Sequence, residues 1–340
     1  MIAVFAPRPP VYFLLGSPRL SRPNPHAIIH GVNFLVTGGA GFLGTALANR
    51  LAREGHQVRV LDDLSAGDAA RLDHAVLFTR GDVNDRPKLW TLLQDVECVY
   101  HLAARVSVPE SILYPREYNA VNVGGTVSVM EAMRDVGVQR VILASSGAVY
   151  GEQAQHTLTE DVVPNPGSPY AVSKLAAEFY VHTIGRLWGI ETVALRIFNA
   201  YGPGQPLPVA HPPVIPHFLR LARQKGTLVV NGSGEQTRDF VYIDDVVDAL
   251  VAAATARSTD IDQQIINVGS GVATRIRDLV THVGTALGVS PHVIYKDNSN
   301  PGVTRMQTDI SKARRLLNFR PRVPLADGLQ HMVTQDDRFR

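Results

Sequence analysis

The stretch that decides the fold begins at Val32 and reads Val32-Asn-Phe-Leu-Val-Thr-Gly38-Gly-Ala-Gly41-Phe-Leu-Gly44. Its first six residues are mostly apolar strand formers, and the residues from Thr45 to Arg53 have the pattern of a helix. Gly38, Gly41 and Gly44, each three residues after the one before, therefore lie between a strand and a helix. The sequence predicts that this segment opens a βαβ unit.

The spacing of these glycines matches the requirements of a dinucleotide. Gly38 permits a tight turn, Gly41 lets a pyrophosphate approach the backbone, and Gly44 lets the helix pack against the sheet. The N-terminus of the helix then directs N–H groups at the anion. We therefore expect Gly38, Gly41, Phe42, Leu43 and Gly44 to contact a bound dinucleotide.

Further apolar runs continue the same alternation along the chain. They lie at Gln57–Leu61, Ala75–Phe78, Cys98–Leu102, Val138–Ala144 and Ile190–Ile197, and helical stretches cover about 110–135 and 169–188. Apolar strands that alternate with helices are typical of a parallel sheet with both faces covered. The predicted fold class is α/β, a doubly wound parallel sheet.

Acidic residues follow the second and third of these strands. Asp62 is placed to bind the adenosine ribose hydroxyls, and its charge would repel a 2′-phosphate, which favours NAD over NADP. Asp63 is a further candidate, although both acids also suit a turn. Asp82 and Val83 follow the third strand, where a side-chain oxygen would reach the adenine; the alternative for Asp82 is a cap or turn residue.

Two segments in the middle of the chain suggest proton transfer. Ser146 follows a predicted strand, and Tyr170 and Lys174 lie one turn apart on a predicted helix. A cation beside a phenol lowers the phenol pKa, so that Tyr170 can take a proton from a hydroxyl group that loses hydride. Lys174 would also hold the nicotinamide ribose, and Ser146 would bridge the substrate oxygen and Tyr170. Tyr150, which has no lysine four residues later, is interpreted as structural.

Composition excludes several classes of protein. The 340 residues include 33 Lys and Arg against 31 Asp and Glu, so a large cationic surface for nucleic acid is not expected. Cys98 is the single cysteine, which excludes an internal disulfide and a cysteine-based metal cluster. No apolar run reaches the length of a membrane span. We expect a cytoplasmic protein without a metal, and a poorly ordered, proline-rich extension at residues 1–31.

Taken together, these motifs resemble the extended short-chain dehydrogenase/reductase family, in its NAD-dependent epimerase/dehydratase branch. The matching segments are Thr37–Gly44, Asp62–Ser65, His101–Ala104, Asn122–Thr126, Ser145–Ser146, Tyr170–Lys174, Arg196–Gly204 and Arg238–Asp245. The resemblance implies an NAD-binding Rossmann domain at 32–200 and a smaller α/β domain at 201–340 that binds a nucleotide-sugar and returns some segments to the first domain.

The resemblance also implies roles for individual residues. Leu102, Ala103 and Ala104 would line the cofactor, and Asn122 would position the loop beside the nicotinamide. Asn199 and Arg238 would contact the diphosphate of the sugar nucleotide.

Within the branch, the sequence favours a 4-epimerase. Sugar dehydratases have an Asp-Glu pair where this chain has Gly147 and Ala148, and decarboxylases have a glutamate at the latter position. The expected activity is that of a UDP-hexose 4-epimerase of the UDP-glucose/UDP-galactose type, through a transient 4-keto sugar. A dehydratase, a reductase and a non-catalytic NAD-sensing protein are the alternatives.

One departure from the family pattern and one further position concern the substrate. Asn300 replaces the arginine that the family uses to bind phosphate, and Arg305 is a candidate to take its place. Gln307 lies where family members adjust the room for an N-acetyl group, but it does not decide the sugar.

The family pairs its subunits through two helices, which here are the segments 110–135 and 169–188. These segments carry more apolar residues than one face needs, namely Val127, Met130, Met133, Phe179 and Tyr180. The expected assembly is a homodimer.

Overall fold

Seven parallel strands form a central sheet in the order β11-β7-β5-β4-β1-β2-β3. The strands are β1 Asn33–Thr37, β2 Gln57–Asp62, β3 Leu77–Arg80, β4 Cys98–His101, β5 Arg140–Ser146, β7 Glu191–Ile197 and β11 Gln264–Val268. The doubly wound α/β fold is therefore confirmed. β11 comes from the last third of the chain, so the polypeptide returns to this sheet after building other elements.

The computed structural model describes residues 31–155, 157–296 and 302–340, which lie within one unit, Gly31–Arg340. Residues 1–30 of the expected extension and Asn300 are outside the described residues. The third strand begins two residues later than the sequence suggested. A turn precedes it, in which Asp73 accepts hydrogen bonds from the backbone N–H groups of Ala75 and Val76 through its side chain and its carbonyl, respectively.

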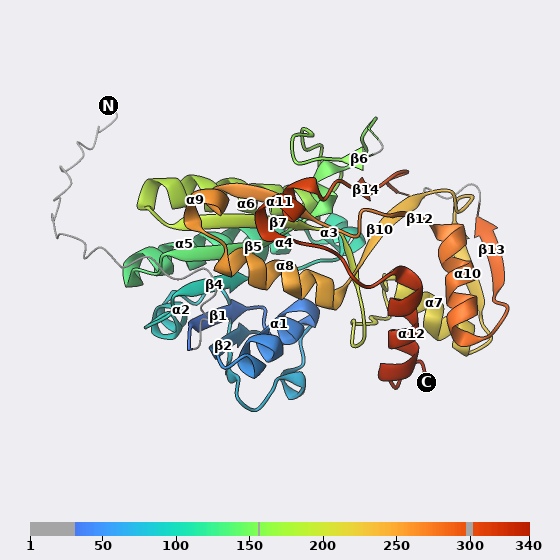
Figure 1. The fold of residues 1–340 in the computed structure, drawn as a ribbon, viewed down its shortest axis with the longest axis horizontal. Coiled ribbons are helices and arrows are strands. Elements are labelled where there is room, and N and C mark those ends of the chain that lie inside the picture. Colours follow the sequence, from blue (N-terminus) through green and yellow to red (C-terminus); the bar gives the residue numbers. More distant parts are fainter. Residues whose placement is uncertain (1–30, 156, 297–301) are drawn as a thin grey trace. The chain divides into compact units, whose positions relative to one another are not determined.

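Two layers of helices cover the two faces of the sheet (Figure 1). One face packs on α1 Phe42–Arg53, α8 Ile243–Thr255 and α11 Ser311–Leu317. The other packs on α2 Arg86–Leu92, α5 Gly125–Val136 and α6 Pro169–Trp188. Alternation along β1 explains the division, because Phe34 and Val36 belong to the first core and Leu35 to the second.

Helix α5 corrects part of the expected dimer surface. Met130 and Met133 are wholly buried in the core between α2, α5 and the sheet, so they do not face outward. Phe179 and Tyr180 on α6 are 65% and 47% exposed, respectively. The sequence pattern did not separate these two groups, because α5 is covered on more than one side.

The helix expected at about 110–135 is divided into several pieces. The chain forms α3 Val108–Leu113, α4 Pro115–Tyr118 and a π-helical turn, η2 Asn119–Gly124, before α5 begins. Pro115 supplies no N–H group and starts a new helix, which explains the first break. The π-turn places Asn122 inward, where it is buried. π-turns of this kind occur often at functional sites.

A third core lies in the C-terminal part of the chain. It is built from α7 Val214–Arg223, α10 Ile276–Leu287 and α12 Leu325–Gln335, which lie together in Figure 1. The smaller sheets are β12-β10-β8, β13-β9 and β14-β6. The remaining elements are β6 Thr157–Leu158, β8 Asn199–Tyr201, β9 Thr227–Asn231, β10 Thr237–Tyr242, β12 Ala273–Arg275, β13 His292–Lys296, β14 Gln307–Thr308, α9 Ser258–Ile261, η1 Ala69–Arg71 and η3 Gly147–Tyr150.

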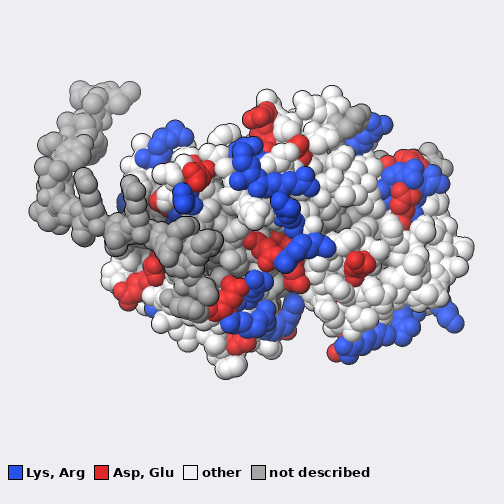
Figure 2. All heavy atoms as spheres, in the orientation of Figure 1, with Lys and Arg blue, Asp and Glu red and all other residues white. Residues whose placement is uncertain are grey.

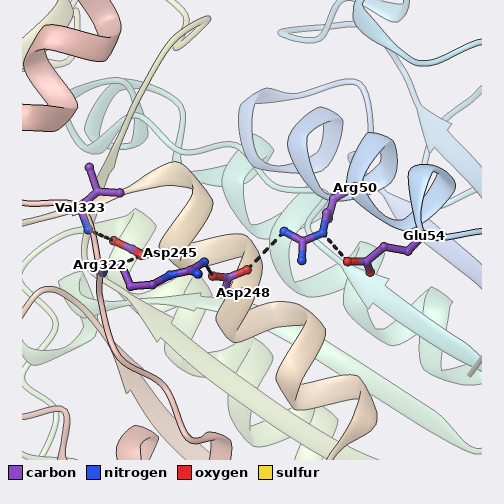
Figure 3. Close-up of polar contacts among 6 residues, drawn as sticks. All are labelled: Arg50, Glu54, Asp245, Asp248, Arg322 and Val323. Atoms are coloured by element: carbon purple, nitrogen blue, oxygen red, sulfur yellow. Dashed lines mark hydrogen bonds and ion pairs between the residues drawn. The ribbon is translucent and has the colours of Figure 1, made fainter. Parts of the chain in front are cut away.

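Polar contacts tie the segment before α12 to α8, one of the helices that cover the large sheet (Figure 3). The buried carboxylate of Asp245 on α8 accepts hydrogen bonds from the backbone N–H groups of Arg322 and Val323, at 2.9 and 3.2 Å. Asp248, one turn later, pairs with Arg322 and with Arg50 of α1. These contacts hold the chain that leads into α12 against α8.

Charges of both signs share the face of the molecule seen in Figure 2, in keeping with the formal net charge of +2. In the part of the chain that the structure describes, no helix combines the length and the apolarity needed to cross a membrane.

Candidate active site

The glycine turn is built as its spacing requires. Gly38 has a φ of +69°, and a Cβ atom at this position would lie 2.6 Å from the backbone nitrogen of Ala103. A Cβ atom at Gly44 would lie 2.2 Å from the carbonyl oxygen of Gly38. Both glycines are therefore needed for backbone packing. Phe42 and Leu43 begin α1, whose first N–H groups have no acceptor within the helix.

The acidic residues after β2 and β3 have different local roles. Asp62 is nearly buried, and its two carboxylate oxygens accept hydrogen bonds from the N–H groups of Ala40, at 3.0 Å, and Leu64, at 2.8 Å. It therefore lies at the glycine turn and retains lone pairs for further donors. Asp63 is exposed and caps the turn at Ser65.

After β3, Asp82 is exposed and accepts a hydrogen bond from the backbone of Asn84. Val83 is buried in the core between α2 and α5. The hydrogen bond from Asn84 to the carboxylate of Asp82 is typical of a turn residue. This is the alternative to an adenine contact that the sequence analysis gave for Asp82.

A buried histidine connects the ends of β1 and β4. His101 Nδ1 lies 2.7 Å from Thr37 Oγ1, and Nε2 lies 2.9 Å from Thr126 Oγ1. Thr126 already donates its hydroxyl hydrogen to the carbonyl of Asn122, so it accepts from Nε2–H, and Nδ1 accepts from Thr37. Burial lowers the pKa of His101 to about 3, and the charge of Lys174 adds to this effect, so the ring is neutral.

Asn122 holds the loop that follows β4. Its Oδ1 accepts from the N–H of Arg105 at 2.8 Å, and its Nδ2 donates to the carbonyl of Arg105 at 3.0 Å. The same Nδ2 donates to Ser173 Oγ at 2.9 Å, and Ser173 donates to the carbonyl of Tyr170. The partly buried Leu102, Ala103 and Ala104 lie in this loop, beside the glycine turn.

Ser146, Tyr170 and Lys174 meet where β5 ends against α6. The hydroxyl group of Ser146 lies close enough to the Tyr170 phenol to act on its pKa. Ser168 caps the start of α6 by accepting from the N–H of Ala171, which sets the first turn that carries Tyr170. Lys174 is buried, and its Nζ donates to the carbonyl of Ala144 at 2.8 Å.

The pKa values of this group correct one expectation. Burial raises the pKa of the Tyr170 phenol above its ordinary value of 10.0, although the hydrogen bond from Ser146 opposes the change. Burial also lowers the pKa of Lys174 to about 8, against the charge of Glu178. Lowering of the phenol pKa by Lys174 is therefore not present here, because desolvation of the phenolate is the larger effect.

The candidate residues for the sugar nucleotide lie on neighbouring strands. Asn199 is exposed on β8 and is paired with Phe240 of β10. Arg238, two residues earlier on β10, is largely buried and donates through Nη1 to the carbonyls of Thr237 and Val303, at 2.7 Å each. Its pKa is lowered from 12.5 by burial.

The segment around Arg305 runs alongside this strand. Thr237 donates its N–H to the carbonyl of Thr304 at 3.0 Å and accepts from the N–H of Met306 at 3.1 Å. Arg305, between these two residues, is exposed. The structure thus brings the segment of Arg305 next to that of Arg238. Gln307 donates to the carbonyl of Gly271.

Asp239 is a structural residue that the sequence did not single out. Its buried carboxylate accepts from the N–H groups of Ser270, Gly271 and Thr308, at 2.7 to 3.0 Å. It therefore joins β10 to the loop after β11 and to strand β14, next to Arg238. Its place next to Arg238 in the motif was the available signal, but its partners are remote in sequence.

Comparison with known proteins agrees with this arrangement. Residues 34–269 match the model of the "NAD dependent epimerase/dehydratase family". The chain belongs to the NAD-dependent epimerase/dehydratase family. The UDP-glucose 4-epimerase of Mycolicibacterium smegmatis is 37% identical over 306 residues, which cover 88% of this chain and 96% of that protein.

Other members of the family are similar over most of the chain. The crystal structure of a Thermotoga maritima UDP-glucose 4-epimerase with UDP-glucose has a TM-score of 0.85 at 32% identity, covering 89% of this chain and 98% of that one. UDP-glucuronic acid decarboxylase 1 of Xenopus tropicalis is 30% identical and covers 88% of this chain and 70% of that protein. The relatives act on nucleotide-sugars but differ in reaction.

The residues present fit the cofactor of this family, NAD. The turn at Gly38 and Gly44 leaves no room for a Cβ atom, and the N-terminus of α1 directs N–H groups at the same turn. Asp62 adds a carboxylate at the end of β2. Within the described residues, no group of three or more His, Cys, Asp and Glu side chains is arranged to hold a metal ion.

Proposed function

We propose that the protein is a UDP-hexose 4-epimerase that inverts C4 of a nucleotide-linked hexose. The observation that carries the proposal is the meeting of Ser146, at the end of β5, with Tyr170 in the first turn of α6, and the buried Lys174 lies one turn further along the same helix. The relatives in Mycolicibacterium smegmatis and Thermotoga maritima, both named UDP-glucose 4-epimerase, support the choice of reaction.

Each residue of the group has a defined task in this proposal. Tyr170 Oη takes the proton of the C4 hydroxyl, and Ser146 holds the same sugar oxygen through a hydrogen bond. Lys174, one turn after Tyr170 on the same helix, binds the nicotinamide ribose. NAD, when bound, supplies the acceptor for the hydride that leaves C4 and later gives it back. The resulting 4-keto sugar rotates in the site, so that the hydride returns to the opposite face of C4. Tyr170 returns its proton to the oxygen, and no external reductant is consumed.

The binding residues follow the division of the chain. We assign the dinucleotide to segment 32–200, with Gly38, Gly41, Gly44 and Asp62 at the pyrophosphate and adenosine ribose. The sugar nucleotide would be held mainly by segment 201–340, with Arg238 and Arg305 at the diphosphate. Arginine suits that contact because its planar fork matches a phosphate group. Asn199 would bind the same diphosphate from β8.

The packing at Gly147 argues against a dehydratase. A Cβ atom at this position would lie 3.0 Å from the ring of Phe198, which is itself buried. A side chain there would therefore require the ring of Phe198 to shift. Ala148, the neighbouring position, carries no group that moves protons. A decarboxylase activity is disfavoured as well, because the glutamate that decarboxylases have at this position is replaced by Ala148.

We also propose that two copies pair through α6. Phe179 and Tyr180 are exposed on this helix, and Val172 and Leu187 are 51% and 74% exposed. An exposed apolar helix face of this kind is typical of a subunit interface. The dimer is the assembly that would cover it.

The test is a panel of UDP-, dTDP- and GDP-hexoses incubated with the purified protein, with the products separated by chromatography. The proposal expects interconversion of the C4 epimers of a UDP-hexose without loss of water or carbon dioxide. A deoxy-keto sugar, a pentose product or consumption of NADPH would assign the protein to another reaction. Tyr170→Phe should lose this interconversion. Its matched control is Tyr180→Phe, which removes the hydroxyl group of an exposed tyrosine on the same helix.

A further inference from the structure

A buried ion pair lies beneath the candidate active site. Arg196 Nη2 lies 2.8 Å from Glu178 Oε2, and Arg196 Nε donates to Glu178 Oε1 at 3.0 Å. The two side chains are only 3% and 1% exposed. Ser145 donates a further hydrogen bond to Oε1 of the same carboxylate. One carboxylate therefore receives three directed hydrogen bonds in the protein interior.

These three residues belong to the elements that carry the catalytic group. Glu178 lies one turn after Lys174 on α6, and Ser145 immediately precedes Ser146 at the end of β5. Arg196 is on β7, directly opposite Ser145 in the strand register and three residues before Asn199. The helix packs against both strands, as Figure 1 shows. The carboxylate thus joins all three elements at one point.

The network continues on the far side of Arg196. Its guanidinium lies over the ring of Tyr150, 4.8 Å from the centroid, and Tyr150 donates to Asn267 Oδ1 at 2.7 Å. Asn267 belongs to the edge strand β11. Its side chain is held in place, because its backbone N–H donates to Glu160 and its Nδ2 donates to the carbonyl of Leu158. The position of the guanidinium is therefore fixed from both sides.

Stability alone is a poor reason for such a pair. Burial of two charges costs several kcal/mol per ion, and replacement of a buried ion pair by apolar residues is often neutral or stabilising. A bidentate pair instead fixes the relative orientation of the two side chains, because its two hydrogen bonds allow less displacement than apolar contacts do. Displacement of a reacting group by about 1 Å can cost about 100-fold in rate.

We propose that Glu178 is a positioning residue for the reaction, whose carboxylate aligns the ends of β5 and β7 with the helix that carries Tyr170 and Lys174. The inference rests on the proposed function for its catalytic readout. Glu178 also supplies the negative charge that faces Lys174. Tyr170 lies one turn before this lysine on the same helix, the neutral His101 of β4 lies within reach of its charge, and Arg196 lies behind the carboxylate.

The first experiment compares Glu178→Gln with Glu191→Gln. Glu191 pairs with Arg140 at the opposite ends of the same two strands, with Nη2 and Oε2 2.7 Å apart, and so provides a matched control. We expect Glu178→Gln to lower kcat by about 10- to 100-fold with little change in KM, and Glu191→Gln to leave kcat unchanged. Equal effects of the two variants on kcat would overturn the proposal.

A second variant removes the penalty of a lone buried charge. Ser145→Ala, Glu178→Met and Arg196→Met together replace the whole polar cluster by apolar groups. We expect this protein to fold with a thermal midpoint close to that of the wild type but to keep the loss in kcat. A stable triple variant with wild-type kcat would show that the pair serves stability only. If the triple variant does not fold, Ser145→Ala alone decides, since it removes one of the three hydrogen bonds and should lower kcat by several-fold; wild-type kcat in Ser145→Ala would then overturn the proposal.

The pH dependence of NAD binding separates this inference from the proposed reaction. Because Lys174 is assigned to the nicotinamide ribose, NAD affinity should fall as Lys174 loses its proton, near pH 8 in the wild type. In Glu178→Gln the same fall should move to lower pH, and an unchanged profile would contradict the role of the carboxylate. This readout needs no sugar substrate, so a wild-type protein that converts no nucleotide-sugar would reject the proposed function and leave this result interpretable.

Discussion

Replacement of Lys174 by methionine should change how the stability of the protein depends on pH. Lys174 is buried at the end of β5, and its pKa is about 8 instead of the ordinary 10.5. A lysine whose pKa is lowered by folding binds its proton less tightly in the folded state than in the unfolded state. The charged form therefore destabilises the fold below pH 8, and this penalty is relieved as the pH rises from about 8 to 10.5.

The size of the effect follows from the two pKa values. Their difference is about 2.5, and each pKa unit corresponds to about 1.4 kcal/mol, which gives about 3 kcal/mol when the whole range is covered. By about pH 9.5 the wild type should have gained roughly 2 kcal/mol relative to neutral pH. Lys174→Met has no proton to release there, so its stability should not include this gain. Methionine keeps most of the length of the side chain but loses the hydrogen bond to Ala144.

The assay is urea unfolding of cofactor-free protein at several pH values between about 7 and 9.5, followed by tryptophan fluorescence. The informative quantity is the difference in unfolding free energy between wild type and Lys174→Met, because other titrating groups cancel in it. We expect the unfolding free energy of the wild type to rise by about 2 kcal/mol relative to that of Lys174→Met over this range. A difference that stays constant with pH would refute the reasoning, since Lys174 would then titrate with an ordinary pKa in the folded protein.

Three further outcomes are expected. Tyr170→Phe should lower turnover by at least about 100-fold and keep NAD affinity, because it removes the proton acceptor but leaves the ring; steady-state kinetics beside Tyr180→Phe measures this, and near-wild-type turnover would remove Tyr170 from the mechanism. Asp62→Asn should narrow the preference for NAD over NADP by about tenfold, equal to about 1.4 kcal/mol, because it removes the charge that repels a 2′-phosphate; calorimetry on cofactor-free protein would detect an unchanged preference. Phe179→Glu should give a monomer by light scattering if α6 forms the subunit interface, whereas a persistent dimer would place the interface elsewhere.

Local patterns in the sequence predicted the framework of the fold. The strand, the three glycines and the helix are contiguous, and the need for Gly38 and Gly44 follows from backbone sterics within a few residues. The spacing of Tyr170 and Lys174 likewise follows from the helical repeat, which places residues four apart on one face. Such features depend on neighbours in the chain, so they can be read before any tertiary contact is known.

Only the tertiary structure decided how these parts are held and how they ionise. Glu178 and Arg196 are 18 residues apart and meet because α6 packs across β7, a contact that no local pattern contains. The pKa of Tyr170 rises instead of falling because burial, which depends on every element packed around the phenol, outweighs the hydrogen bond from Ser146. The inward turn of Asn122 arises in the same way, since a π-turn replaces the regular helix where the chain reaches Arg105 and Ser173. Residue periodicity predicts which elements form, whereas desolvation and hydrogen bonding between remote segments are set by how those elements pack.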